Sequence, residues 1–144
     1  MLNDQQPILA LDVGESRIGI AISDPTKTLA SPGKTVQTRN ALHEILEFVD
    51  RNNVAAILIG LPYLPSGEKG AQYGKTKNFI NEISDLTNTP IITIDERYST
   101  IEAKKKILES INLNHSKRSK KHIPKNLIDS ASATVILQSY LDNL

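Results

Sequence analysis

The architecture follows from one stretch near the N-terminus, Asp12-Val13-Gly14-Glu15-Ser16-Arg17-Ile18-Gly19-Ile20-Ala21. Apolar and β-branched residues on both sides of its centre predict two strands, at about 8–13 and 18–23, that form a β-hairpin. Gly14 and Gly19 allow the backbone to bend, or allow another group to approach it closely. The first strand ends on Asp12, where a lone buried charge is costly unless a partner or a metal ion compensates it. Asp12 therefore either caps its own turn or belongs to a functional site.

The composition limits the classes of protein to consider. A chain of 144 residues suits one domain, residues 1–144, with a proper hydrophobic core. The absence of cysteine excludes a disulfide framework and a thiolate metal site, and it suits a reducing compartment. The sequence shows no signal-peptide pattern and no apolar run of the roughly 20 residues that cross a bilayer. We expect a cytoplasmic protein with no membrane partner.

The charges are distributed unevenly. From Arg97 to Lys125 there are nine Lys or Arg residues and two acids, which gives a local net charge of +7 in a chain whose total is +1. Clustered cations gain from neutralising phosphates and releasing counterions, so this asymmetry indicates a polyanionic partner. The alternative is a solvated helix face followed by a lysine-rich loop. The densest cluster consists of Lys117, Arg118, Lys120 and Lys121.

The order of the expected elements predicts an α/β fold. Strands are expected at about 8–13, 18–23, 34–38, 55–59 and 91–94, and helices at about 41–50, 75–86, 99–110 and 127–141. A break at 31–33 precedes the third strand, residues 60–70 form a loop, and the basic segment 112–125 has no periodicity. Three strands followed by alternating helices and strands form a mixed sheet, with the first three strands antiparallel and later ones joined by helical crossovers.

Acidic residues stand at the ends of three expected elements: Asp12, the pair Asp95-Glu96, and Asp129. Sites in open sheets form at strand ends, and carboxylates without His or Cys favour hard cations such as Mg²⁺ or Mn²⁺, which support phosphodiester hydrolysis. Each acid also has a structural alternative. Asp95 and Glu96 can pair with Arg97, and Asp129 can interact with the dipole of its helix. Because neighbouring strand residues face opposite ways, only one of Asp95 and Glu96 should reach Asp12; we favour Glu96, although strand phase leaves the choice open.

The glycine-rich loop Gly60–Gly70 lacks the spacing of a P-loop. Its backbone amides and Lys69 can approach a phosphate or position a strand of nucleic acid. An ordered turn with no ligand explains the same residues equally well.

Taken together, four stretches resemble the YqgF/RuvX family of Holliday-junction-resolvase-like proteins, which are described as pre-16S rRNA nucleases. The stretches are Leu11 to Ala21 with Ser23-Asp24, Ile59-Gly60-Leu61-Pro62 with Gly67, Gly70 and Gln72, Asp95-Glu96-Arg97-Tyr98-Ser99-Thr100 with Glu102-Ala103, and Ile128 to Ala133 continuing through Ile136 to Leu141. The resemblance covers nearly the whole chain. It departs mildly at Tyr98 and Ser132, neither of which is one of the acids.

The resemblance implies an RNase H-like fold, with a five-stranded mixed sheet flanked by helices. It also implies that Asp12, Glu96 and Asp129 are the metal-binding catalytic acids of a nuclease that matures the 5′ end of the small-subunit rRNA precursor, with Mg²⁺ or Mn²⁺ as cofactor. The expected partners are precursor rRNA or another structured nucleic acid, and pre-ribosomal particles. The expected phosphate contacts are Arg17, unless it is a solvent-facing turn residue, together with Arg97, Lys117, Arg118, Lys120 and Lys121.

Three other functions are compatible with parts of the sequence. A DNA junction resolvase normally needs a symmetric dimer, whereas we expect a monomer or a weak dimer because nothing in the sequence predicts a strong interface. A sugar-kinase-like or chaperone-like ATPase also opens with an Asp-x-Gly hairpin, but 144 residues leave no room for its repeated fold and second phosphate loop. A non-catalytic nucleic-acid-binding module would need the basic segment and not the three acids.

Overall fold

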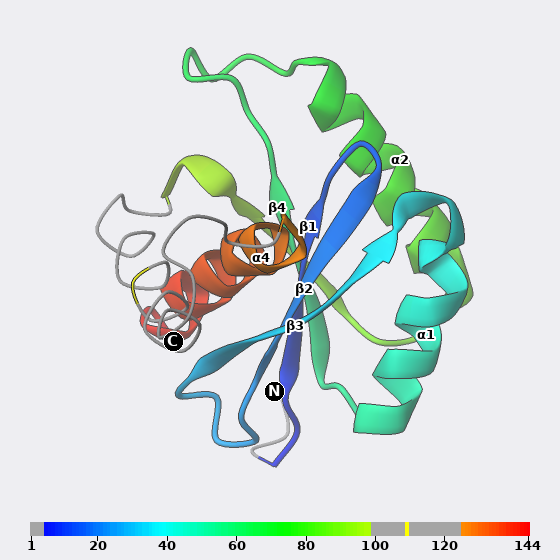
Figure 1. Cartoon of the computed structure of the whole chain (residues 1–144), viewed down its shortest axis with the longest axis vertical. Helices are drawn as coiled ribbons and strands as arrows, with labels where there is room; N and C mark the ends of the chain where they lie inside the picture. Colours follow the sequence, from blue (N-terminus) through cyan, green and yellow to red (C-terminus); the bar gives the residue numbers. More distant parts are fainter. Residues whose placement is uncertain (1–4, 99–108, 110–124) are drawn as a thin grey trace.

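The computed structural model describes residues 5–98, 109 and 125–144. The elements in chain order are β1 (Ile8–Val13), β2 (Arg17–Ser23), β3 (Ala30–Gln37), η1 (Thr38–Asn40), α1 (Ala41–Asn52), β4 (Ala56–Leu61), α2 (Ala71–Leu86), β5 (Ile91–Asp95), η2 (Glu96–Tyr98) and α4 (Lys125–Leu141). A central sheet separates α4 on one side from α1 and α2 on the other (Figure 1).

The sheet has five strands in the order β3-β2-β1-β4-β5. The pairs β1–β2 and β2–β3 are antiparallel, whereas β1–β4 and β4–β5 are parallel. The expected mixed sheet, with its first three strands antiparallel, is therefore confirmed. Because β1, β4 and β5 are parallel, their carboxyl ends lie at one edge of the sheet.

The two faces of β1 bury different residues. Leu9 and Leu11 belong to the apolar cluster under α1 and α2, whereas Ile8 and Ala10 belong to the cluster under α4. All four are fully buried. Since strand side chains alternate between faces, the next even position, Asp12, lies on the α4 face of the sheet.

β3 differs from the sequence expectation. It begins at Ala30, not near residue 34, and it runs through Pro32 and Gly33. The strand lies at the edge of the sheet, where a proline is tolerated because no further strand needs its missing N–H. The pairing of β2 with β3 also shifts register between Gly19 and Ala21, as in a β-bulge. The break expected at 31–33 is therefore a bulge within an edge strand.

The helices agree more closely with expectation. α2 begins at Ala71, four residues earlier than expected, and α4 begins at Lys125, two residues earlier. The helix expected at 99–110 and the basic segment 112–125 fall outside the described residues, apart from Glu109 and Lys125. In the part of the chain that the structure describes, no helix has both the length and the apolar character needed to span a membrane.

Candidate active site

Asp12 lies at the edge of the sheet where the parallel strands end. It is half-buried, and it pairs with Gly19 across the β1–β2 hairpin. On the other side of β1, Leu11 pairs with Ile59 of β4. The next residue of β4, Gly60, therefore lies beside Asp12. Gly60 shares the α4 face with Leu58, two residues earlier on β4. Asp12 and Gly60 are thus neighbours on one face of the sheet.

The carboxylate of Glu96 lies against Gly60. A Cβ atom built on Gly60 would be 2.7 Å from both Cγ and Oε1 of Glu96, and 2.9 Å from Cδ1 of Ile136 on α4. Glu96 is half-buried and is the first residue of η2, immediately after β5. The space that a side chain at Gly60 would fill is therefore occupied by the Glu96 carboxylate, on the face that carries Asp12.

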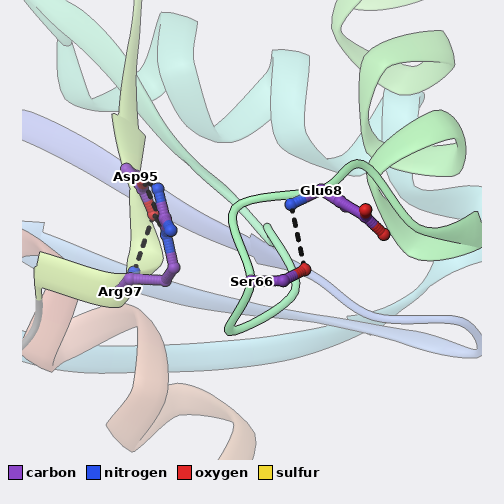
Figure 2. A network of polar contacts seen from close by, with 4 residues as sticks. All are labelled: Ser66, Glu68, Asp95 and Arg97. Atoms are coloured by element: carbon purple, nitrogen blue, oxygen red, sulfur yellow. Dashed lines mark hydrogen bonds and ion pairs between the residues drawn. The ribbon is translucent and has the colours of Figure 1, made fainter.

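Asp95 serves a different purpose from Glu96. It accepts a hydrogen bond from the backbone N–H of Arg97 at 2.9 Å, and its Oδ2 lies 2.7 Å from the Nη2 of Arg97 (Figure 2). The side-chain hydrogen bond from Arg97 holds the pKa of Asp95 below its usual value. Asp95 and Arg97 thus form a clamp on either side of Glu96, which fixes the backbone of η2. The pairing with Arg97 that the sequence offered as an alternative is made by Asp95.

Arg97 also contacts the loop that follows β4. Its guanidinium lies 5.2 Å from the ring centroid of Tyr63, whose ring is 5.0 Å from that of Tyr73, and Lys69 Nζ lies 5.1 Å from the Tyr73 ring. A cation is attracted to the electron-rich face of an aromatic ring, so this row of two stacked rings between two cations ties the loop to η2. The loop itself is ordered: Tyr63 bridges to Lys69, and Leu64 bonds to Glu68.

The turn at the tip of this loop lies beside the clamp. Ser66 Oγ accepts a hydrogen bond from the N–H of Glu68 at 3.3 Å (Figure 2). Gly67 has a positive φ of 88°, which favours glycine, and its Cβ position lies 3.2 Å from Nη1 of Arg97. The loop thus packs on the side of Arg97 opposite the sheet strand that carries Asp95.

The start of α2 holds the end of β1. Gln72 Nε2 donates a hydrogen bond of 2.8 Å to the carbonyl of Val13, the residue after Asp12. Lys75 Nζ lies 3.1 Å from Glu15 Oε1 in the hairpin turn. We did not identify Gln72 as a site residue from the sequence, because its partner is 59 residues away and no local pattern connects the two.

α4, the helix that contains the third expected acid, packs on the same face of the sheet. The helix packs on the sheet through Ala133, Ile136 and Leu137, and Ser130 Oγ donates to the carbonyl of Gly33 on β3 at 2.9 Å. Asp129 belongs to this helix, but its side chain lies outside what the structure describes. Position 129 is seven residues before Ile136, and this spacing of about two turns puts both positions on one stripe of the helix.

The expected phosphate contacts are placed only in part. Arg17 is half-buried at the start of β2, where it pairs with Gln37 of β3. Arg97 is exposed and engaged with Asp95 and Tyr63. Lys117, Arg118, Lys120 and Lys121 lie outside the described residues.

The donor set fits a hard divalent cation. Asp12 and Glu96 offer carboxylate oxygens at adjacent strand ends, and such oxygens are the ligands that Mg²⁺ and Mn²⁺ prefer. Within residues 5–98, 109 and 125–144, no three His, Cys, Asp or Glu side chains gather around a point where a metal ion could bind. Asp129, whose side chain is not among those described, is on α4, the helix that packs on this face.

Solved structures show the fold class of the chain. Thermus thermophilus RuvC in complex with a Holliday junction substrate superposes with a TM-score of 0.63 at 12% identity, over 96% of both chains. The fowlpox virus resolvase in complex with Holliday junction DNA gives 0.56 at 17% identity, over 96% of this chain and 98% of the other. At these identities the likeness shows the fold, which is RNase H-like.

Sequence relatives are closer. The model of the RuvX family, described as Holliday junction resolvase, matches residues 6–143. A relative from Roseiflexus sp. is 35% identical over 99% of both chains, and one from Bartonella bacilliformis is 38% identical over 99% of this chain and 86% of its own. Both carry the name "Putative pre-16S rRNA nuclease". The protein is a phosphodiester-cleaving nuclease, and the chain belongs to the RuvX family.

Proposed function

We propose that this nuclease is a metal-dependent endonuclease that matures the 5′ end of pre-16S rRNA. The observation that carries the metal-dependent site is the Glu96 carboxylate, which lies against Gly60 on the strand beside Asp12. The name shared by the relatives supports the substrate. In this proposal, residues 1–144 act as one RNase H-like domain, in the cytoplasm and on pre-ribosomal particles, as a monomer or a weak dimer.

The acids and their supports have separate roles in this proposal. Asp12, Glu96 and Asp129 hold Mg²⁺ or Mn²⁺, which supplies an activated water and stabilises the charge that develops on the phosphate. Glu96 also orients the attacking water. The Asp95–Arg97 clamp keeps Glu96 in place, while Gln72 holds the backbone next to Asp12.

Basic residues hold the phosphate backbone of the substrate. The proposed contacts are Arg17, Arg97, Lys117, Arg118, Lys120 and Lys121. Arg97 contributes both to this contact and to the clamp, because it lies at the end of β5 beside Glu96.

A four-way DNA junction is the second candidate substrate, because the matching family model is described as Holliday junction resolvase. Both substrates contain the same phosphodiester chemistry, so the acids do not distinguish them. The cleavage experiment therefore has to compare the RNA and the DNA substrate directly.

The test compares cleavage of pre-16S rRNA fragments with cleavage of a four-way DNA junction. Each is incubated with the full chain in Mn²⁺ or in EDTA, and with the Glu96→Gln variant. Glu47→Gln, an exposed glutamate on α1, is the matched control. We expect Mn²⁺-dependent cutting of the rRNA fragment that EDTA and Glu96→Gln abolish and Glu47→Gln preserves. Cutting that survives EDTA, or that favours the junction, would contradict the proposal.

A further inference from the structure

An open groove surrounds the turn between β1 and β2. It consists of two adjoining hollows, of about 630 Å³ and about 410 Å³, which share Glu15, Thr38 and Arg39. The smaller hollow reaches Val13 on the α1 and α2 face of the sheet, whereas the larger hollow includes Arg17, whose position is on the face that carries Asp12. We infer that this groove binds the phosphate backbone of a substrate strand beside the scissile bond. The inference rests on the proposed function, because it names the path of the strand into that site.

The larger hollow is the positively charged end of the groove. It is lined by Arg17 and Arg39, by one acid, Glu15, and by neutral polar residues, so the two arginines outnumber the acid. Arg39 is exposed, and its Nε donates to the neutral Gln37 Oε1 at 3.0 Å. Within the described part of the chain, Arg39 makes no ion pair, so its positive charge is available to an anion.

The smaller hollow is closer to electrical balance. Lys75 and Glu15 form an ion pair at 3.1 Å, and the charge of Glu82 balances that of Arg39, which lines both hollows. The positive potential of the groove therefore comes from its arginine end. Arg17 is two residues before Gly19, the pairing partner of Asp12, so its position is on the sheet face that carries Asp12. Phosphate contacts of this kind position a strand and take no part in the chemistry.

The arginine end is held rigidly against the hairpin. The N–H of Thr38 donates to the carbonyl of Ser16 at 3.0 Å, and Thr38 Oγ1 donates to the carbonyl of Gly14 at 3.3 Å. Arg17 and Gln37 face each other in the β2–β3 ladder. These contacts fix the backbone on which Arg39 stands relative to both Arg17 and the end of β1, so this backbone needs little ordering on binding.

The shape and chemistry of the groove favour an extended polyanion. Arginine presents a planar fork of donors that matches phosphate oxygens and is more weakly hydrated than an ammonium group. The groove is open along its length, and it is lined by side chains and not by the glycine-rich backbone that cradles a single nucleotide phosphate. A strand of RNA or DNA, with phosphates at regular intervals, fits both features.

Equilibrium binding of fluorescent single-stranded RNA and DNA oligonucleotides tests the inference, with EDTA present so that cleavage plays no part. The variants are Arg39→Gln and the matched control Arg51→Gln, an exposed arginine in the last turn of α1. We expect Arg39→Gln to weaken binding by about threefold to tenfold and to lower the slope of log K against log salt by about 0.7. Arg51→Gln should leave both unchanged. A third variant, Glu15→Gln, should tighten binding, since it removes a negative charge from the groove.

The outcomes separate this inference from the proposed function. If Arg39→Gln binds with unchanged affinity and salt slope while the wild-type protein binds, the groove is not the path of the strand. Equal weakening of binding by Arg39→Gln and Arg51→Gln would also overturn the inference. In that case binding would respond to the net charge of the protein and not to the groove. If binding depends on Arg39 but Mn²⁺ supports no cleavage, the groove stands and the proposed catalysis fails.

Discussion

At the scale of single residues, the site depends on one glycine. Gly60 leaves the space that the Glu96 carboxylate occupies, and Ile136 closes the same space from α4. The clamp of Asp95 and Arg97 then fixes the backbone on either side of Glu96. A side chain at position 60 would therefore compete with the carboxylate directly.

Gly60→Ala should reduce cleavage by about tenfold or more while the protein still folds. The new Cβ would lie 2.7 Å from both Cγ and Oε1 of Glu96 and 2.9 Å from Ile136 Cδ1, so the Glu96 side chain and the tip of Ile136 have to shift. Overpacking of this kind costs about 1 to 3 kcal/mol, and the loss of unfolded-state entropy offsets up to about 1 kcal/mol of it, so the free energy of unfolding should fall by about 2 kcal/mol or less. Cleavage rate and urea unfolding of the same preparation measure the two effects.

Gly74→Ala is the matched control for this prediction. Gly74 lies inside α2 with no atom within 4 Å of its Cβ position, so alanine should stabilise the helix by about 1 kcal/mol. Its cleavage rate should equal that of the wild-type protein. Full activity in Gly60→Ala would show that Glu96 does not need its place against Gly60.

The sequence predicted part of the residue-level description. Asp12 could be proposed as a site residue because a charged residue at the end of an apolar strand is unusual. The choice between Asp95 and Glu96 depends on where β5 ends and η2 begins, and a five-residue strand followed by a single 3₁₀ turn does not reveal that boundary. Gln72 stands in one of the stretches that carry the family resemblance, but no local pattern predicts its hydrogen bond to Val13. Arg39 had no signal in the sequence, because the residues around it come from different parts of the chain.

At the scale of elements, the turn between β2 and β3 shows how short-range polar contacts fix an edge strand. Asp24 Oδ1 accepts hydrogen bonds from the N–H groups of Thr28 and Leu29, each at 2.8 Å, and Asp24 Oδ2 accepts one from Thr26 Oγ1. Gln138 of α4 then holds the start of β3, because its Oε1 accepts the N–H of Ala30 at 2.9 Å.

The Asp24 contacts predict an acid-sensitive contribution to stability. The hydrogen bond from Thr26, followed by those from Leu29 and Thr28, lowers the pKa of Asp24 from 3.8 to about 2. A carboxyl group whose pKa is depressed by folding stabilises the protein above the unfolded value, and this stabilisation is lost as the pH falls from about 3.8 to about 2. Asp24→Ala should therefore unfold at a lower urea concentration than the wild-type protein at pH 6, and the difference should narrow toward pH 2.

Asp50→Ala, an exposed acid at the end of α1, is the control for this titration. Urea midpoints measured every half pH unit give the comparison. If the gap between Asp24→Ala and the wild-type protein stays constant from pH 6 to pH 2, the turn does not act through the charge of Asp24.

The sequence predicted most elements because β1, β2 and β4 are continuous apolar runs bounded by turn residues. It was wrong about the start of β3, since Pro32 and Gly33 are also the residues that break strands elsewhere. Their effect depends on position: an edge strand with a bulge accepts both. Whether β3 lies at the edge is decided by the order of all five strands, so the sequence of residues 30–37 alone does not predict it.

At the scale of the whole molecule, the chain separates its charges. The acids of the site lie at the carboxyl ends of β1 and β5, whereas nine of the 17 basic residues lie between positions 97 and 125. A polyanionic substrate is attracted by the second group and repelled by the first unless a cation intervenes. Binding and catalysis should therefore respond separately to changes in the two groups.

The double variant Lys120→Glu with Lys121→Glu should weaken binding to pre-16S rRNA fragments and lower the salt slope by about 1 to 2, because each lost phosphate contact lowers it by about 0.7 to 0.9. Fluorescence anisotropy over a range of salt concentrations measures both quantities. The matched variant Arg51→Glu, which also reverses a charge, should keep the wild-type slope. An unchanged slope in the double variant would show that the basic segment does not contact phosphates.

The central claim is that Asp12 and Glu96 together hold a divalent cation. Calorimetric titration of Mn²⁺ into the full chain tests it most directly, with Asp12→Asn and Glu96→Gln as the variants and Asp50→Asn as the control. Both substitutions in the site remove a charge and keep the volume. We predict that the wild-type protein and Asp50→Asn bind Mn²⁺ alike, and that Asp12→Asn and Glu96→Gln each lose most of this binding. Binding of Mn²⁺ to Asp12→Asn with the affinity and stoichiometry of the wild-type protein would contradict the claim.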